Sequence, residues 1–261
     1  MKLSSANINV MVKACRKAAK TIIRDFGEIE NLQVSLKGPG DFVTVSDRKV
    51  ETILIDELQK ARPDYSILSE ELGEIKKDES YRWIIDPIDG TANFLHGIPH
   101  FAISIALEHK KEIICGIVYD PIKDEMFAAE KGNGSYLNNQ RMRVSSRSKL
   151  KNCIIFTGGP NSQSKDRDLS MKEYNNFSSN VLIPIRKLGS AALDMAYVAA
   201  GRCDGFWQRN LNYWDIAAGI ILVKESGGFV TDFDGENKYV QNRTILVTNS
   251  KINNEMIEVL K

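Results

Sequence analysis

Apolar residues recur every three to four positions near the start of the chain, with polar residues between them. This spacing predicts an amphipathic helix that ends near Gly27. A second helix is predicted from about Asp47 to Ala61, with a stop before Pro63. The turn-rich segment 37–41 lies between the two. The apolar face of the first helix comprises Ile8, Met11, Val12, Cys15, Ala18, Ala19, Ile22, Ile23 and Phe26.

From Tyr81 the pattern changes to short apolar runs separated by turn residues, which is typical of strands. Charged or glycine-containing segments divide the later runs, so we predict an antiparallel meander. The runs are Trp83–Ile85, Ala102–Leu107, Ile113–Tyr119 and Met126–Ala129.

The second half of the chain alternates predicted strands and helices. It contains no repeat and no linker long enough to separate independent domains. We therefore expect a single catalytic unit with two lobes, residues 1–145 and 146–261. The predicted elements are a strand at Cys153–Thr157, a polar helical or loop segment at 162–180, a small-residue helix at Ser190–Ala200, a helix after Trp214-Asp215, and strands at Gly228–Thr231 and Thr244–Val247.

Composition and charge narrow the class of protein. The 261 residues include 35 Lys+Arg and 34 Asp+Glu, a net charge of +1, which argues against a dedicated nucleic-acid binder. The hydrophobic share of 43% is that of an ordinary globular protein and excludes disordered and collagen-like chains. Four dispersed cysteines indicate reduced thiols. Because neither a signal peptide nor a membrane span is recognisable, we expect a cytoplasmic protein.

The strongest chemical signal is a pair of aspartates, Asp86 and Asp89, directly after the apolar run Trp83–Ile85. Pro87 disfavours simple continuation of the strand, and Gly90 allows the backbone to approach a ligand closely. A helix is predicted to begin at Thr91 or Ala92, where backbone N–H groups suit a phosphate.

Other acidic residues occur in similar contexts. Glu70 and Glu71 follow the run Ile67-Leu68, Asp215 follows Trp214, and Asp47 stands at the mouth of the second helix. Oxygen ligands without a His or Cys cluster favour Mg²⁺ over Zn²⁺. Each residue also has a simpler interpretation: a helix N-cap for Asp47 and Asp215, a turn for Asp89-Gly90, and surface charge for the two glutamates.

Taken together, these segments resemble the inositol monophosphatase family. The matching segments, which follow the family's order over nearly the whole chain, are 41–47, 69–71, 86–91 with Asn93-Phe94, 188–192 and 214–219. The resemblance implies an α+β fold, the layered α-β-α-β-α sandwich of the inositol monophosphatase and fructose-1,6-bisphosphatase type. It also implies a Mg²⁺-dependent phosphomonoesterase, inhibition by lithium and a homodimer.

The resemblance also implies roles for individual residues. Glu70, Asp86 and the carbonyl of Ile88 correspond to ligands of one Mg²⁺, and Asp86, Asp89 and Asp215 to ligands of a second, with a weaker ion near Glu70. The implied catalytic residues are Asp47, Glu70 and Thr91, of which Asp47 and Thr91 orient the attacking water. The implied substrate-side residues are Asp89, Gly90, Thr91, Gly189, Ser190, Ala191, Gln208 and Asp215.

From this arrangement we expect direct hydrolysis by water with no phosphoenzyme. The substrate is predicted to be inositol 1-phosphate or a similar small polyol or sugar phosphate. At position 208 this chain has Gln, where inositol-specific members of the family have Glu. A neutral amide cannot make a charge-assisted hydrogen bond to a substrate hydroxyl. Histidinol phosphate and nucleotide phosphates therefore stay open as alternatives.

Parts of the sequence are also compatible with other classes of protein. A haloacid-dehalogenase-type phosphatase also carries Asp-Gly-Thr after a strand, but its two aspartates are separated by one residue rather than two. Gly97 and Pro99 argue against a helical metal face at His96 and His100. The basic run Arg141–Lys151 lacks aromatic residues that could stack on bases, so we interpret it as a solvated loop. The alternative is that the chain is a regulatory protein of this fold and that the run binds RNA or a transcription partner.

Overall fold

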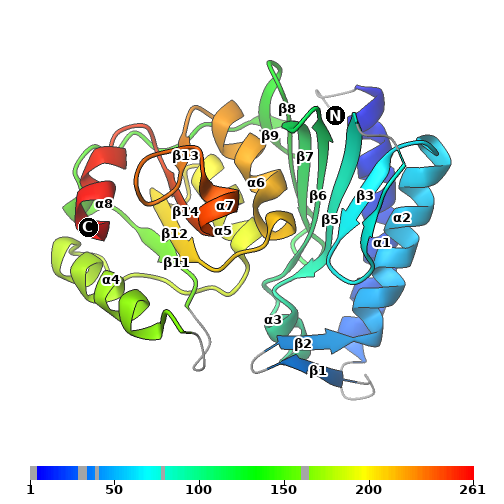
Figure 1. The fold of residues 1–261 in the computed structure, drawn as a ribbon, viewed down its shortest axis with the longest axis horizontal. Helices are drawn as coiled ribbons and strands as arrows, with labels where there is room; N and C mark the ends of the chain where they lie inside the picture. The colour runs from blue at the N-terminus through cyan, green and yellow to red at the C-terminus, as the bar shows by residue number, and fades with distance from the viewer. Residues whose placement is uncertain (1–4, 29–33, 39–40, 78–79, 160–164) are drawn as a thin grey trace.

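The computed structural model describes residues 5–28, 34–38, 41–77, 80–159 and 165–261; for 34–38 and 41–44 only the backbone is considered (Figure 1). The helices are α1 (Ala6–Gly27), α2 (Val45–Ala61), α3 (Thr91–Leu95), η2 (Leu150–Asn152), α4 (Arg167–Asn180), α5 (Ala191–Ala199), α6 (Tyr213–Glu225), α7 (Tyr239–Asn242) and α8 (Asn253–Leu260). The strands are β1 (Val34–Gly38), β2 (Asp41–Thr44), β3 (Ser66–Ser69), β4 (Gly73–Ile75), β5 (Tyr81–Asp89), β6 (Ala102–His109), β7 (Glu112–Asp120), β8 (Glu125–Glu130), β9 (Gly134–Leu137), β10 (Gln140–Arg141), β11 (Ile155–Thr157), β12 (Gly205–Arg209), β13 (Phe229–Thr231) and β14 (Thr244–Thr248).

The first helix forms as its periodicity predicts, although Ile23 of the predicted apolar face is 49% exposed. Ser5 caps α1, because its hydroxyl oxygen accepts a hydrogen bond from the N–H of Ile8 at 3.3 Å. The buried face of α1 packs with α2 against one side of the large sheet. Burial of this apolar stripe, rather than helix propensity alone, holds the helix in place.

An eight-stranded sheet, in the order β10-β9-β8-β7-β6-β5-β3-β4, is the larger of the two main sheets. Strands β5 to β8 are the predicted antiparallel meander, which β9 and β10 extend beyond the prediction, whereas β3 pairs with β5 in parallel. Alternate residues of β5 face opposite sides: Trp83 and Ile85 pack toward α1 and α2, and Ile84 packs toward α5 and α6. The sheet is therefore covered on both faces (Figure 1).

A second sheet lies beyond α5 and α6, in the order β11-β12-β14-β13. Its far side packs on α4 and α8 through Phe177, Trp207 and Met256. The succession of helices, sheet, helices, sheet and helices confirms the five layers expected for this α+β fold (Figure 1).

Several boundaries differ from the predictions. Strand β5 continues through Pro87 to Asp89, and α2 begins at Val45, so Asp47 lies within its first turn rather than at the N-cap. Strand β12 and helix α8 were not predicted. Pro39 and Gly40 of the predicted turn at 37–41, and residues 162–164 of the polar segment, lie outside the described residues. Within the described ranges, no helix is long and apolar enough to cross a membrane.

Candidate active site

Asp86 and Asp89 are brought together by an irregularity in β5. Asp86 pairs with Ser104 and Asp89 with Ala102, so β5 contains one more residue than β6 over this stretch. In a regular strand, side chains three positions apart point to opposite faces, and the extra residue of a bulge removes that offset. Asp86 also accepts a hydrogen bond from the N–H of Ile88 at 3.1 Å, which stabilises the bend. Both carboxylates are buried, with 2% and 9% of their surface exposed.

Three further acidic residues from different elements lie near this pair. Asp47 lies in the first turn of α2, Glu70 follows β3, and Asp215 lies in the first turn of α6. Burial raises the pKa of Asp86 well above its usual range, and repulsion from Glu70, Asp89, Asp215 and Asp47 raises it further. The structure therefore brings together all five acidic residues predicted from the sequence, in a site rich in negative charge.

Asp215 also stabilises the start of its own helix from the third helical position. Its Oδ2 accepts a hydrogen bond of 2.7 Å from the N–H of Asn212, which forms a capping box at the start of α6. Burial, together with repulsion from Asp89, nevertheless raises the pKa of Asp215. The N-cap of α6 is Asn212 and Asp215 is the third helical residue, so the simpler interpretation of Asp215 as an N-cap is wrong, while its position is compatible with the site.

Asp89 is connected to the N-terminus of α5. Its Oδ2 accepts hydrogen bonds from the hydroxyl of Ser190 and, at 2.7 Å, from the N–H of Ala192. Burial raises the pKa of Asp89 to about 6, although these donors and the N–H of Ala191 act in the opposite direction. The small residues predicted for the substrate side thus adjoin the carboxylate cluster.

Gly90 makes the sharp turn from β5 into α3. Its φ of +95° is left-handed, and a Cβ there would lie only 3.1 Å from the carbonyl oxygen of His100 and 3.2 Å from that of Gly189. Immediately after it, the hydroxyl of Thr91 donates a hydrogen bond of 2.9 Å to the carbonyl of Ile88. This turn therefore places Gly90, Thr91 and Gly189 close together.

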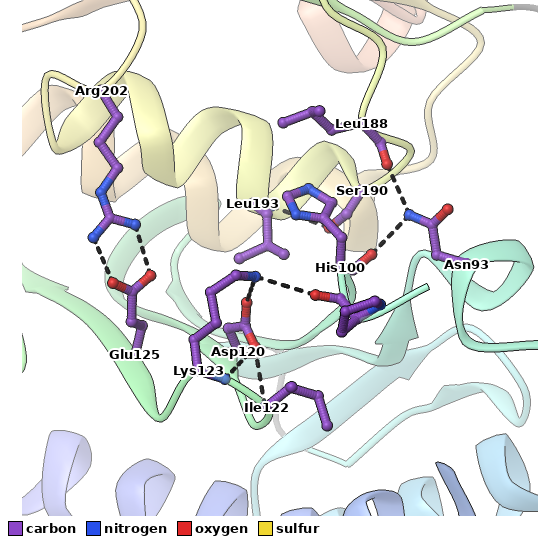
Figure 2. A network of polar contacts seen from close by, with 11 residues as sticks. Asn93, His100, Asp120, Ile122, Lys123, Glu125, Leu188, Ser190, Leu193 and Arg202 are labelled. Atoms are coloured by element: carbon purple, nitrogen blue, oxygen red, sulfur yellow. Dashed lines mark hydrogen bonds and ion pairs between the residues drawn. The ribbon is translucent and has the colours of Figure 1, made fainter. Parts of the chain in front are cut away.

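Asn93 is a residue of this region that the sequence analysis did not single out for a role. Its side-chain amide donates two hydrogen bonds of 2.7 Å, one to the carbonyl of His100 and one to that of Leu188 (Figure 2). The second bond joins α3 to the segment that leads into Gly189 and α5. Its place at the end of the matched motif was the only sequence signal for this connection.

Gln208 lies on β12, which pairs with β14 and in parallel with β11. Its side-chain amide lies against Gly158, where an added Cβ would come within 1.9 Å of Oε1. Its neighbour Arg209 forms an ion pair with Glu173 of α4. Gln208 is thus placed by the second sheet, while the carboxylates are placed by β3, β5, α2 and α6.

The donor set of the cluster fits a hard divalent cation. It consists of carboxylate oxygens and the Ile88 carbonyl, and the buried negative charges repel one another, so a bound cation would relieve that repulsion. Within the described part of the chain, however, no three acidic, His or Cys side chains already form a compact coordination shell. Metal binding would therefore require these side chains to move closer together.

The fold and this site define a class of protein. The chain matches the inositol monophosphatase family over residues 5–260 and belongs to that family. An inositol-1-monophosphatase of Mesorhizobium japonicum is 49% identical over 258 residues, covering 98% of this chain and 97% of that protein. The Nus factor SuhB of Escherichia coli K12 is 39% identical over 258 residues, covering 96% and 94%.

A solved structure is also similar. The extragenic suppressor protein suhB of Bartonella henselae superimposes with a TM-score of 0.95 at 50% identity, covering 98% of this chain and 99% of that one. The family assignment replaces the haloacid-dehalogenase alternative, which the spacing of Asp86 and Asp89 already disfavoured.

Proposed function

We propose that this protein is a Mg²⁺-dependent phosphomonoesterase that hydrolyses inositol 1-phosphate or a similar small polyol or sugar phosphate. The observation that carries the proposal is the convergence of Asp47, Glu70, Asp86, Asp89 and Asp215 around the end of β5. The relative from Mesorhizobium japonicum, named an inositol-1-monophosphatase, supports the same substrate class.

In this proposal Glu70, Asp86 and the Ile88 carbonyl hold one Mg²⁺, and Asp86, Asp89 and Asp215 hold a second. When bound, such ions lower the pKa of a coordinated water and neutralise charge on the leaving oxygen. The protein supplies the positions of the ligands, because phosphoryl transfer depends mainly on positioning and charge stabilisation.

The remaining residues bind and orient the reactants. The Thr91 hydroxyl donates to Ile88, so its lone pairs are available to accept a hydrogen bond from the attacking water, which Asp47 also orients. The N–H groups of Gly90 and Thr91 donate to the phosphate. Gly189, Ser190 and Ala191 adjoin Asp89 on the side proposed for the polyol ring.

Gln208 would contact the substrate through a neutral amide. It can donate and accept hydrogen bonds but provides no charge-assisted bond to a hydroxyl. We therefore keep histidinol phosphate and nucleotide phosphates as substrate candidates beside inositol 1-phosphate. We further propose a homodimer in the cytoplasm, consistent with four buried free cysteines.

A second candidate function is a regulatory protein that acts on an RNA or transcription partner. The similarity to proteins named Nus factor SuhB favours it. The basic residues of the run Arg141–Lys151 are exposed, although Arg147 is ion-paired with the buried Asp204. An exposed basic segment alone supports this function less strongly than the carboxylate cluster supports phosphate hydrolysis.

A phosphate-release panel tests the proposal. Purified wild type and Asp89→Asn are assayed with Mg²⁺, with and without lithium, on inositol 1-phosphate, fructose 1,6-bisphosphate, histidinol phosphate and a 3′-phosphoadenosine nucleotide. We expect lithium-sensitive turnover by the wild type and a large loss in the variant. Equal phosphate release by both proteins on every substrate would favour the regulatory function, and a phosphorylated residue trapped during turnover would contradict direct hydrolysis.

A further inference from the structure

Glu51 is a buried acidic residue on α2 that no role described above uses. It lies one helical turn after Asp47 on the buried face of the helix, and only 1% of its surface is exposed. A carboxylate so deeply buried is costly unless hydrogen bonds compensate for the lost water. The identity of its partners therefore matters.

Those partners belong to the turn that carries Glu70. Glu51 Oε1 accepts a hydrogen bond of 3.0 Å from the N–H of Glu71, and the N–H of Leu72 also interacts with the carboxylate. On the other side, the N–H of Glu70 donates to the carbonyl of Ile85 at 3.2 Å. The backbone at Glu70 is thus held between α2 and β5, next to Asp86.

Apolar packing contributes little to this turn. Ser69 pairs with Gly73 across the hairpin of β3 and β4, and Leu72 at its tip is 59% exposed. Arg48 of α2 lies 3.8 Å from Glu71; the Arg48 side chain is 72% exposed and that of Glu71 only 5%, so this ion pair is a second, partly solvated connection. The bonds to Glu51 are thus a buried connection between the backbone of this turn and α2.

The turn needs such a connection because electrostatic repulsion pushes Glu70 away from the other carboxylates. Glu70 and Asp86 repel each other, and Glu70 is the leading charged neighbour of Asp86. Without a restraint, this repulsion would move Glu70 away from the cluster. Groups that hold metal ligands in place commonly change metal affinity about 10- to 100-fold when removed.

We propose that Glu51 is a positioning residue that holds the Glu70–Leu72 turn so that Glu70 faces Asp86 in the metal site. The inference rests on the proposed function, since it assigns Glu70 to a divalent cation. Glu51 itself does not contact substrate; it acts through the backbone N–H groups of Glu71 and Leu72.

The test measures Mn²⁺ binding by calorimetry in the absence of substrate, together with thermal stability. Glu51→Ala removes both acceptor oxygens, and Glu51→Gln keeps one in a side chain of the same shape. Glu57→Ala is the matched control, because Glu57 is also a buried acid on α2 but pairs with Lys13 and Lys17. We expect Mn²⁺ affinity to fall about tenfold in Glu51→Ala and less in Glu51→Gln. Glu57→Ala should lower the melting temperature without changing Mn²⁺ affinity.

Unchanged Mn²⁺ affinity in both Glu51 variants, or an equal loss in Glu57→Ala, would overturn the proposal. Hydrogen exchange of the wild type gives a second measurement should Glu51→Ala not fold: the amides of Glu71 and Leu72 should be protected, and rapid exchange would contradict the role. If the protein releases no phosphate but its Mn²⁺ affinity still depends on Glu51, the substrate assignment is refuted. The positioning role of Glu51 is then supported. A wild type that binds no Mn²⁺ would overturn both.

Discussion

Ser190 donates a hydrogen bond from Oγ to Asp89 Oδ2, although 101 positions separate the two residues in the sequence. The same hydroxyl oxygen accepts a bond of 3.3 Å from the N–H of Leu193, so Ser190 is also the N-cap of α5. One side chain thus fixes the start of a helix and orients a carboxylate of the proposed metal site.

Replacement of this hydroxyl should therefore affect both stability and activity. Loss of an N-cap costs about 1 kcal/mol, and loss of a hydrogen bond to a charged group about 1.5–3 kcal/mol. We expect Ser190→Ala to be destabilised by roughly 1–3 kcal/mol in urea denaturation and to release phosphate more slowly. Ser190→Thr keeps the hydroxyl and should retain most of both; equal losses in the two variants would contradict the role of the hydroxyl.

Gly90 should tolerate substitution less well than a glycine with the same backbone preference elsewhere. Gly132 also has a positive φ, +78°, but nothing lies within 4 Å of an added Cβ, whereas at Gly90 three atoms lie within 3.2 Å. A left-handed backbone costs an L-residue about 1–2 kcal/mol. We expect Gly132→Ala to show that cost alone and Gly90→Ala to show more, measured by urea denaturation. Equal destabilisation would mean that the surroundings of Gly90 adapt.

Asp86→Asn should stabilise the metal-free protein while it impairs metal binding. The substitution removes the charge that four neighbouring carboxylates oppose, and the amide oxygen can still accept from Ile88. Differential scanning calorimetry should show a higher melting temperature without metal and a smaller increase on addition of Mg²⁺. If metal-free Asp86→Asn melted at a lower temperature than the metal-free wild type, the repulsion around Asp86 would already be relieved in the wild type.

The parts of the fold that were predictable are those determined by local pattern. Helix α1 and the meander from β5 to β8 follow from periodicity within one element and from short connections. Strand β12 was missed because Phe206 and Trp207 read equally well as general packing residues, and their strand status depends on pairing with β11 and β14. Such pairing is decided by tertiary structure.

In the site, too, some features follow from local sequence pattern and others depend on tertiary structure. Asp47, Glu70, Asp86, Asp89 and Asp215 could be proposed individually because each follows an apolar run or opens a helix. Their convergence depends on the bulge in β5 and the parallel pairing of β3 with β5, which no local pattern specifies. Glu51 carried only a weak signal, its spacing of one helical turn from Asp47.

His100 offers a test of pH dependence away from the carboxylate cluster. Its Nε2 is buried and has no hydrogen-bond partner among the described residues, and its ring lies 5.8 Å from that of Tyr197 of α5. Asp120, the last residue of β7, and Lys123, in the turn that follows it, are the charged groups nearby (Figure 2). Burial and repulsion from Lys123 lower the pKa of His100 from 6.5 to about 4, although Asp120 acts in the opposite direction.

A pKa lower in the folded than in the unfolded state means that the folded state favours neutral His100. Its contribution to stability is therefore complete above about pH 6.5 and is lost as the pH falls toward about 4. His100→Phe keeps an aromatic ring and cannot titrate. The free energy of unfolding of the wild type minus that of His100→Phe should be constant above pH 7 and decrease between about pH 6.5 and 4. A difference that stays constant across this range would show that His100 titrates alike in both states.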